Sequence, residues 1–374
     1  MKHDLTDKTD RAKISRAPAE FLYEKELSTL ASFDTHSKPP GWKLSPKAVR
    51  IFILGGDANG TPIEKKFYGD DTLIDRCIVT LMGNRGLMLV GEPGTAKSML
   101  SELLAAAISG TSLLTIQGTA GTTEDQINYS WNYARLLAEG PGLNALAPSP
   151  VFHGITQGAI VRFEELTRCA PEIQDSLISI LSEKVLLIPE LGDSGILFAK
   201  KGFNIIATAN IRDRGVHEMS SALKRRFNFE TVEPISDKQL ELDLVLKQTK
   251  RLLDEMQANV EINRDVLSLL VSTFHDLRNG KTEEGTIVEK PSTVLSTAEA
   301  VSVGISAGLD SCYFGNGKLE EHHIVRQLVG TVLKDDPEDA KKLKNYFDVV
   351  VKVRSRQGKH WKAFYDARKW LKGS

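Results

Sequence analysis

Two short stretches of the chain carry residue types that bind and activate phosphates. The first is GEPGTAKS, residues 91–98, which follows an apolar run and precedes a helical pattern. Glycines allow backbone N–H groups to turn toward phosphate oxygens, and the N-terminus of the next helix adds partial positive charge. Strand, turn, Lys-Ser pair and helix together predict a phosphate-binding loop. The residues that we expect around a nucleotide are Gly91, Glu92, Pro93, Gly94, Thr95, Ala96, Lys97, Ser98 and Met99.

Two side chains of this loop would act on the phosphates directly. Lys97 supplies a point charge for the β- and γ-phosphates, and Ser98 offers its hydroxyl to Mg²⁺. One residue departs from the general pattern, because Ala96 stands where a glycine usually precedes the lysine.

The second stretch, residues 159–165, is a mostly apolar run that ends in two carboxylates. A phosphate-binding loop requires a metal-holding carboxylate on a neighbouring strand. We therefore expect Glu164 to hold Mg²⁺ through water and Glu165 to polarise the attacking water. Aspartate is usual at the first position, and Arg162 is unusual in such a strand. The alternative is a buried strand that runs into a solvated acidic turn, but the preceding loop favours the catalytic interpretation.

An asparagine and a pair of arginines that follow these stretches could also act on a nucleotide. Asn210 follows the β-prone run 203–209, and a polar residue at the carboxyl end of a parallel strand lies where such sheets bind ligands. It could equally end the strand in a turn. Arg225 and Arg226 lie at a helix end between the apolar residues Leu223 and Phe227. They form either a solvated face or an arginine finger for a neighbouring subunit.

In the order of its motifs the chain resembles AAA+ ATPases of the MoxR-like, dynein-related branch. The resemblance extends from about residue 67 to about residue 309 and includes the alanine before the lysine. It implies ATP and Mg²⁺ as cofactors, with Lys97 and Ser98 as Walker A, and Glu164 and Glu165 as Walker B. Asn210 would be sensor 1. Arg226 matches the arginine finger best and Arg225 second. The sensor 2 arginine of the family has no match, since Val294 stands in the expected place.

The resemblance and the pattern of elements predict an α/β P-loop NTPase fold. A three-layer αβα core with a parallel sheet would span residues 48–235, with an insertion at 117–149 and a pre-sensor hairpin at 185–199. An all-α lid would follow at 236–335. A polar N-terminal extension, flexible or partner-docking, would occupy 1–47, and a basic helical tail 336–374. In the lid, Ser236, Asn263 and Ser292 look like helix caps, and Gly308 looks like a helix stop.

Composition limits the partners, metals and cellular location that we expect for the chain. The net charge of −1 gives the whole chain no bias toward nucleic acid or membrane. The three cysteines are isolated, and no histidine or cysteine spacing suits a transition metal. The amino terminus lacks an apolar signal region, and no apolar run approaches the roughly 20 residues that span a bilayer. We expect a cytoplasmic protein without membrane contact.

The tail is the one strongly basic segment. From residue 337 onward it holds eleven Lys or Arg against four acids, with interleaved aromatic residues. Such a segment can bind nucleic acid. A solvated helix whose aromatic residues pack on the lid or on a partner is the interpretation that we favour.

The motifs favour Mg²⁺-dependent ATP hydrolysis, and an arginine finger supplied to a neighbour implies a ring, expected to be a hexamer. The resemblance implies that this ring remodels, matures or inserts cofactors into partner protein complexes. By resemblance, the partners would be a protein client and a protein with a von Willebrand factor A domain. Two alternatives stay open. One is a GTP- or ATP-driven motor of the McrB type that acts on DNA, suggested by the stretch after Asn210 and by the basic tail. The other is a non-hydrolysing nucleotide-dependent scaffold.

Overall fold

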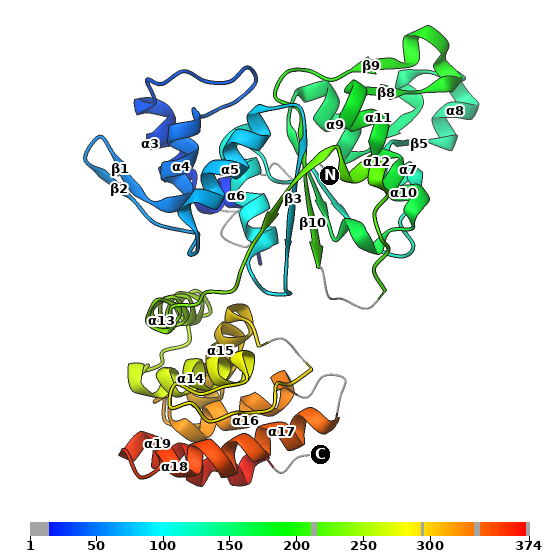
Figure 1. Cartoon of the computed structure of the whole chain (residues 1–374). Coiled ribbons are helices and arrows are strands. Elements are labelled where there is room, and N and C mark those ends of the chain that lie inside the picture. The colour runs from blue at the N-terminus through cyan, green and yellow to red at the C-terminus, as the bar shows by residue number, and fades with distance from the viewer. Residues whose placement is uncertain (1–14, 211–214, 293–294, 333–336, 372–374) are drawn as a thin grey trace. The chain divides into compact units, whose positions relative to one another are not determined.

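The computed structural model describes residues 15–210, 215–292, 295–332 and 337–371 (Figure 1). The chain divides into two compact units. The first comprises Met1–Gly91 with Ala96–Val232, and the second comprises Glu92–Thr95 with Glu233–Ser374. Strands and helices alternate in the first unit, whereas the named elements of the second are all helices. The chain therefore has the α/β core and the all-α region that its sequence predicts.

A five-stranded parallel sheet forms the centre of the first unit. Its strands are β3 (Gly86–Gly91), β4 (Thr115–Gln117), β7 (Ile160–Glu164), β10 (Asn204–Asn210) and β11 (Phe227–Thr231). They lie in the spatial order β11-β3-β10-β7-β4, and each neighbouring pair is parallel. In this register Asn210 stands opposite Gly91. The carboxyl ends of β3, β7 and β10 thus meet at one edge of the sheet, where open α/β sheets bind ligands.

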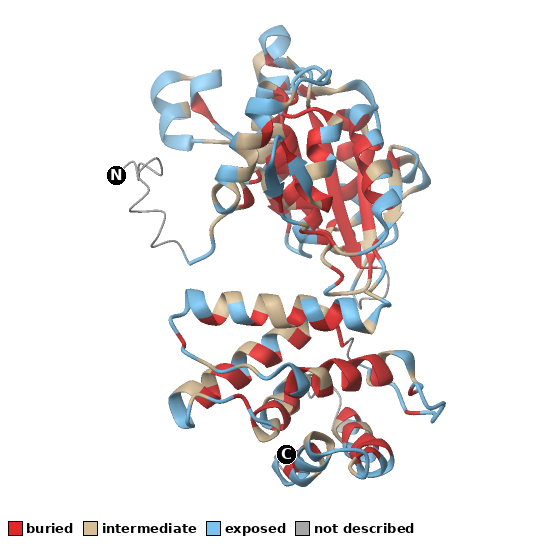
Figure 2. Ribbon diagram, turned by 90° about the vertical axis from the view of Figure 1, so that its left-hand side faces the viewer, coloured by how far each residue is buried: buried red, intermediate tan, exposed pale blue. Residues whose placement is uncertain are grey.

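Helices cover both faces of this sheet. Along β3, Leu87 and Leu89 pack in one buried cluster and Met88 in another, as the alternation of side chains along a strand requires. The first cluster draws on α4 (Pro46–Leu54), α5 (Asp71–Met82) and α6 (Lys97–Ser109), and the second on α9 (Pro150–Gln157) and α11 (Leu177–Glu183). Figure 2 shows the sheet as a buried layer between helices with exposed outer faces. The predicted three-layer αβα core is confirmed.

Residues 15–47 pack on the core, which differs from the expected flexible extension. They form α2 (Ala19–Leu22) and α3 (Glu24–Phe33), and Ala19, Leu30 and Trp42 are buried in the first cluster. Polar contacts tie the segment down as well, since the carboxylate of Glu20 accepts hydrogen bonds from the N–H and the hydroxyl of Ser112. A small antiparallel ribbon, β1 (Gly56–Ala58) and β2 (Thr61–Ile63), follows α4.

Two excursions leave the sheet between β4 and β10. The insertion holds α7 (Glu124–Ile127), β5 (Tyr129–Trp131), α8 (Tyr133–Glu139), η1 (Leu143–Ala145) and β6 (Leu146–Pro148), with β5 and β6 antiparallel. After β7 come η2 (Leu166–Arg168), α10 (Pro171–Asp175) and α11. The hairpin predicted at 185–199 follows as β8 (Val185–Leu187) and β9 (Ile196–Phe198), joined by η3 (Pro189–Gly195). The hydroxyl of Tyr129 donates to Glu190 Oε2 at 2.7 Å and links the two excursions. After β10, α12 (Ser221–Lys224) precedes β11.

The second unit is a set of packed helices. Its elements are α13 (Lys238–Glu255), α14 (Arg264–Asn279), α15 (Thr297–Phe314), α16 (Glu321–Val332), α17 (Pro337–Tyr346), η4 (Phe347–Val351), α18 (Lys352–Arg354), α19 (Lys359–Asp366) and η5 (Ala367–Leu371). Tyr346, Phe347 and Phe364 are buried in the same cluster as α13 to α16. These three aromatic residues of the basic tail thus pack on the helices that precede it, as the favoured interpretation expects, whereas Trp370 is exposed.

Three helix ends in this unit differ from the sequence prediction. The side chain of Asp237, and not that of Ser236, accepts from the first N–H groups of α13. Ser296 caps α15 through a capping box, while Ser292 donates its N–H and hydroxyl to Asp339. Gly308 lies inside α15, where a Cβ would come within 2.6 Å of Leu253 Cδ1. Gly308 therefore permits close packing of α15 on α13 and ends no helix.

The sequence also predicts that the chain has no membrane span and no sensor 2 arginine. No helix within the described ranges is long and apolar enough to cross a bilayer. Val294, at the expected sensor 2 position, lies outside the described residues.

Candidate nucleotide site

The predicted phosphate-binding loop connects the end of β3 to the start of α6. Ala96, immediately before the helix, has φ 68° and ψ 20°. This left-handed conformation costs an L-residue about 1–2 kcal/mol, which explains why glycine is usual there. The side chain of Lys97 is buried, and its Nζ donates to the carbonyl of Gly91 at 3.1 Å. The ammonium group is thus held against the loop that would surround the phosphates.

Ser98 and Glu164, the two predicted metal ligands, are in direct contact. The hydroxyl of Ser98 donates to Glu164 Oε2 at 2.7 Å. The hydroxyl of Thr208 on β10 donates to the same oxygen at 2.8 Å. Hydroxyl and carboxylate oxygens are the hard donors that Mg²⁺ prefers, and they are gathered here at the start of α6. The residues therefore fit the expected metal.

Arg162 explains why this strand carries a charged residue among apolar ones. Its guanidinium donates to Glu164 Oε1 at 2.8 Å, to the hydroxyl of Ser101 at 2.9 Å and to the carbonyl of Ser98 at 3.0 Å. Arg162 and Glu164 have side-chain exposures of 10% and 6%, so the pair is desolvated. Arg162 thus connects the carboxylate of Glu164 on β7 to the first turn of α6.

Burial, three hydrogen bonds and the charge of Arg162 determine the charge state of Glu164. Burial raises the pKa of this carboxyl. Hydrogen bonds from Ser101 and Ser98, the charge of Arg162 and the hydrogen bond from Thr208 outweigh burial, so the pKa lies below its ordinary value. Glu164 is therefore ionised near neutral pH, as a metal ligand must be.

Glu165 and Asn210 also meet as predicted. The side-chain amide of Asn210 donates to Glu165 Oε1 at 2.7 Å. Glu165 has φ 56° and ψ 43°, a left-handed conformation at the end of β7. Its backbone N–H donates to the hydroxyl of Thr208 at 3.0 Å, and Arg168 Nε lies 3.5 Å from its Oε2. A strained backbone held by surrounding contacts is frequent at active sites. Glu165 thus has partners on β10 and η2, whereas Glu164 has partners on α6, β7 and β10.

The two arginines after α12 have different surroundings. Arg226 is half-buried, and its guanidinium donates to the hydroxyl of Ser182 and to the carbonyl of Ala222, both at 2.8 Å. Arg225 is exposed. Among the described residues neither arginine has a hydrogen bond to Lys97, Ser98 or the two glutamates. Within one chain, therefore, the arginines are not part of the cluster that the other predicted residues form.

Sequence reasoning missed three contributors to this cluster, namely Ser101, Thr208 and Arg168. Two of these three residues could have been found from their spacing in the sequence. Ser101 lies one helical turn beyond Ser98, so both project from one face of α6. Thr208 lies two residues before Asn210, so both project from one face of β10. Arg168 comes from η2, a short turn that no periodicity announces.

Comparison with known proteins places both units in families. Residues 86–227 match the AAA domain of the dynein-related subfamily, and residues 239–372 match the YehL-like AAA+ ATPase C-terminal domain. The protein YehL of Escherichia coli (strain K12) is 50% identical over 357 residues, which cover 95% of this chain and 97% of YehL. Protein SSP1341 of Staphylococcus saprophyticus is 26% identical over 210 residues, 54% of this chain and 75% of that protein. The predicted dynein-related AAA+ membership is confirmed.

Solved structures with a similar course of the chain include NtrX from Brucella abortus. One NtrX structure aligns with a TM-score of 0.49 and 11% identity, over 81% of this chain and 63% of that chain. Another, in complex with ADP, aligns with a TM-score of 0.48 and 12% identity, over 82% of this chain and 69% of that chain. This chain thus spans less than two thirds of the first NtrX chain, and its fold is defined by its own sheet order and by the family matches.

Proposed function

Because this chain belongs to the family of YehL-like AAA+ ATPases, we propose that it hydrolyses ATP with Mg²⁺ and remodels partner proteins. One observation carries the proposal. At the carboxyl ends of neighbouring strands, Ser98 meets Glu164 and Asn210 meets Glu165. One pair suits a metal and the other suits a water molecule, and hydrolysis of a nucleotide needs both.

The chain's own residues divide the work as follows. Lys97 turns from the carbonyl of Gly91 toward the β- and γ-phosphates and offsets their charge. Glu165 accepts a proton from the attacking water, while Asn210 holds the carboxylate in place. Ser98 and Glu164 bind Mg²⁺, which when bound neutralises charge on the transferring phosphoryl group. The contacts of Glu164 with Arg162 and Thr208 keep this carboxylate from rotating away.

Arg226 acts on the nucleotide of a neighbouring copy in this proposal. Its contacts with Ser182 and Ala222 support its guanidinium at a fixed place on the surface of the first unit. A residue supplied to the next copy implies head-to-tail contacts, and such contacts close into a ring, here a hexamer. The clients would be protein complexes, with a von Willebrand factor A-domain protein as partner, in the cytoplasm.

A non-hydrolysing scaffold is the second candidate, and Arg162 favours it. An arginine that already neutralises Glu164 lowers the net negative charge available to Mg²⁺. A protein that binds Mg²⁺ weakly would bind nucleotide without hydrolysing it, and the nucleotide would act only as a switch. The McrB-type alternative gains less support, because Tyr346, Phe347 and Phe364 of the tail are buried and cannot stack on a base. Trp370 is the large apolar side chain of the tail's aromatic set that stays exposed.

A complementation experiment tests the motor directly. Phosphate release is measured with Mg·ATP and Mg·GTP for the wild type and for the Glu165→Gln and Arg226→Ala variants, with molecular mass recorded on the same samples. The proposal expects release from ATP, loss in both variants and a ring mass with ATP. Mixing the two inactive variants should restore part of the activity, because some interfaces then pair an intact Glu165 with an intact Arg226.

Matched controls separate catalysis from folding. Glu172→Gln and Arg356→Ala change exposed residues outside the cluster and should keep wild-type rates. A wild type that binds ATP without releasing phosphate supports the scaffold. Stronger turnover of GTP that DNA stimulates supports the McrB-type motor.

A further inference from the structure

The strand β4 forms an edge of the central sheet and pairs only with β7 among the described strands. Two hydrogen bonds fix which of its peptide groups face β7. Arg162 N–H donates to the carbonyl of Leu114 at 2.8 Å, and Gly118 N–H donates to the carbonyl of Glu164 at 2.7 Å. Because peptide groups alternate in direction along a strand, those of Thr115 and Gln117 face the opposite side.

Two of these outward groups are available for pairing. The N–H of Thr115 donates to the carbonyl of Leu113, and the carbonyl of Gln117 accepts at 3.4 Å from the hydroxyl of Thr122. Within the described part of the chain, the carbonyl of Thr115 and the N–H of Gln117 have no hydrogen-bond partner. In a parallel ladder one residue of an added strand donates to the first and accepts from the second. The edge therefore offers a two-point attachment for one residue of an extended chain.

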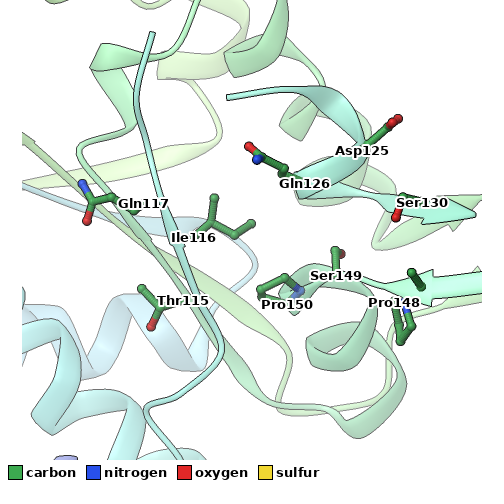
Figure 3. Close-up of a pocket in the computed structure, with 10 residues that line it drawn as sticks. Thr115, Ile116, Gln117, Asp125, Gln126, Ser130, Pro148, Ser149 and Pro150 are labelled. Carbon is green, nitrogen blue, oxygen red and sulfur yellow. The ribbon is translucent and has the colours of Figure 1, made fainter. Parts of the chain in front are cut away.

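A cavity of about 460 Å³ lies along this edge (Figure 3). Its volume is within the range of sites that enclose small ligands or short peptide segments. Figure 3 shows the three residues of β4 on one side and the insertion across from them. The residues that line the cavity are Thr115, Ile116, Gln117, Asp125, Gln126, Ser130, Ala147, Pro148, Ser149 and Pro150. We call this set the β4 groove.

The side chains of the β4 groove indicate the chemistry of an occupant. Asp125 is the charged residue among those that line it, and it is exposed at the start of α7 next to the exposed Glu124. A lysine or arginine side chain would complement this charge. Ala147, Pro148 and Pro150 supply apolar surface for the neighbouring side chains of the occupant, whereas Ile116 is buried.

We propose that the β4 groove binds an extended peptide of another protein, which adds to β4 as a parallel strand and places a lysine or arginine beside Asp125. Strand addition provides main-chain hydrogen bonds for affinity, and the cavity and carboxylate provide selectivity. The groove uses none of the side chains of the nucleotide cluster. The inference therefore stands whether or not the protein hydrolyses ATP.

Peptide selection followed by binding measurements tests this inference. A random heptapeptide library is selected on the full chain, and labelled enriched peptides are titrated by fluorescence anisotropy. Enriched peptides should contain lysine or arginine. Gln117→Pro removes the N–H and should weaken binding about tenfold or more, whereas Gln117→Ala keeps the N–H and should bind like the wild type. Asp125→Lys should weaken the same peptides about tenfold, and Glu139→Lys, a charge reversal on exposed α8, should not.

Two readouts keep the result independent of misfolding. The unfolding transition of each variant identifies any that fails to fold. In the wild type, saturating peptide should slow hydrogen exchange of the Gln117 amide, which requires no substitution. Failure to enrich any peptide, or enriched peptides that bind all variants equally, would overturn the inference. So would a dimer of the chain that Gln117→Pro abolishes and that the peptides do not dissociate, because a second copy would then be the occupant.

Discussion

The two units of the molecule each bury a glutamate beside an arginine, and the two clusters have different consequences. In the first unit, Glu164 accepts from Ser98, Thr208, Ser101 and Arg162. In the second, Glu241 is fully buried; Thr297 donates to its Oε1 at 2.6 Å, Arg278 to its Oε2 at 2.7 Å, and His275 also contacts it.

The difference lies in what surrounds the carboxylate. Glu164 meets a hydroxyl of the phosphate-binding loop at the carboxyl ends of strands, so a metal can take the place of a hydrogen bond. Glu241 lies in the first turn of α13. Its partners are side chains in the last turns of α14 and the first turn of α15, so its contacts hold these helix ends together. Arg278 also donates to the carbonyls of Leu295 and Ile235. In our proposal, the contacts of the first unit hold a carboxylate that binds a metal. Similar contacts in the second unit join helix ends.

The largest expected effect is in the second unit. Glu241→Ala leaves the guanidinium of Arg278 buried without its carboxylate, which costs about 3–5 kcal/mol of unfolding free energy. Urea unfolding followed by circular dichroism measures this loss. Glu283→Ala, which removes an exposed partner of Lys238, is the control and should change stability by less than about 1 kcal/mol. A cost for Glu241→Ala no larger than that of the control would contradict the structural role.

The same pairing in the first unit should respond to metal. Arg162→Met leaves Glu164 without its cation and should cost about 2–3 kcal/mol when Mg²⁺ is chelated, since three hydroxyl donors remain. Millimolar Mg²⁺ should restore much of the thermal stability of this variant, because the metal then supplies the positive charge. Arg278→Met, the matched change in the second unit, should not respond to Mg²⁺. An equal response of the two variants to Mg²⁺ would contradict the claim that Glu164 binds a metal and Glu241 does not.

Lys184 provides the opposite case, a buried charge without a carboxylate. Its Nζ has no hydrogen-bond partner among the described residues and lies 5.5 Å from the ring of Phe203. Burial lowers the pKa of this ammonium from 10.5 to about 8. Between these two values the unfolded chain binds more protons than the folded one, so stability rises with pH across that window.

Lys184→Met should therefore stabilise the protein at pH 7, where the penalty for the buried charge is fully present. The shift in pKa corresponds to about 3 kcal/mol, and the partial exposure of the side chain reduces the expected gain to about 1–2 kcal/mol. The gain should shrink as the pH rises through 8 and disappear near 10.5. Melting temperatures over this pH range check the effect, with the exposed Lys201→Met as control. A gain that does not change with pH would show that packing, and not the charge, is responsible.

The sequence predicted which residues meet at the carboxyl ends of β3, β7 and β10 because the motifs that contain them are local. Lys97 and Ser98 are neighbours, as are Glu164 and Glu165, and the carboxyl ends of parallel strands bring them together. Glu241, His275 and Thr297 come from three helices far apart in the chain, so no spacing announces their contact. Gly308 was misread as a helix stop because the requirement for close packing on Leu253 exists only in the folded unit.

The departures from the usual motif could be noticed but not interpreted from the sequence. Arg162 looked anomalous in an apolar strand until its contacts with Glu164 and Ser101 were known. Residues 15–47 looked like an extension because they are polar, although a few buried positions, such as Leu30 and Trp42, suffice to hold them on the core.

The most direct test of the central claim compares the wild type with Glu165→Gln. Binding of a fluorescent ATP analogue and release of phosphate from Mg·ATP are measured on the same preparations. The account predicts that the variant binds nucleotide as the wild type does and releases phosphate at least about 100-fold more slowly, because it lacks the base for the attacking water. Phosphate release by Glu165→Gln at the wild-type rate would contradict the assignment of this cluster as a hydrolytic site.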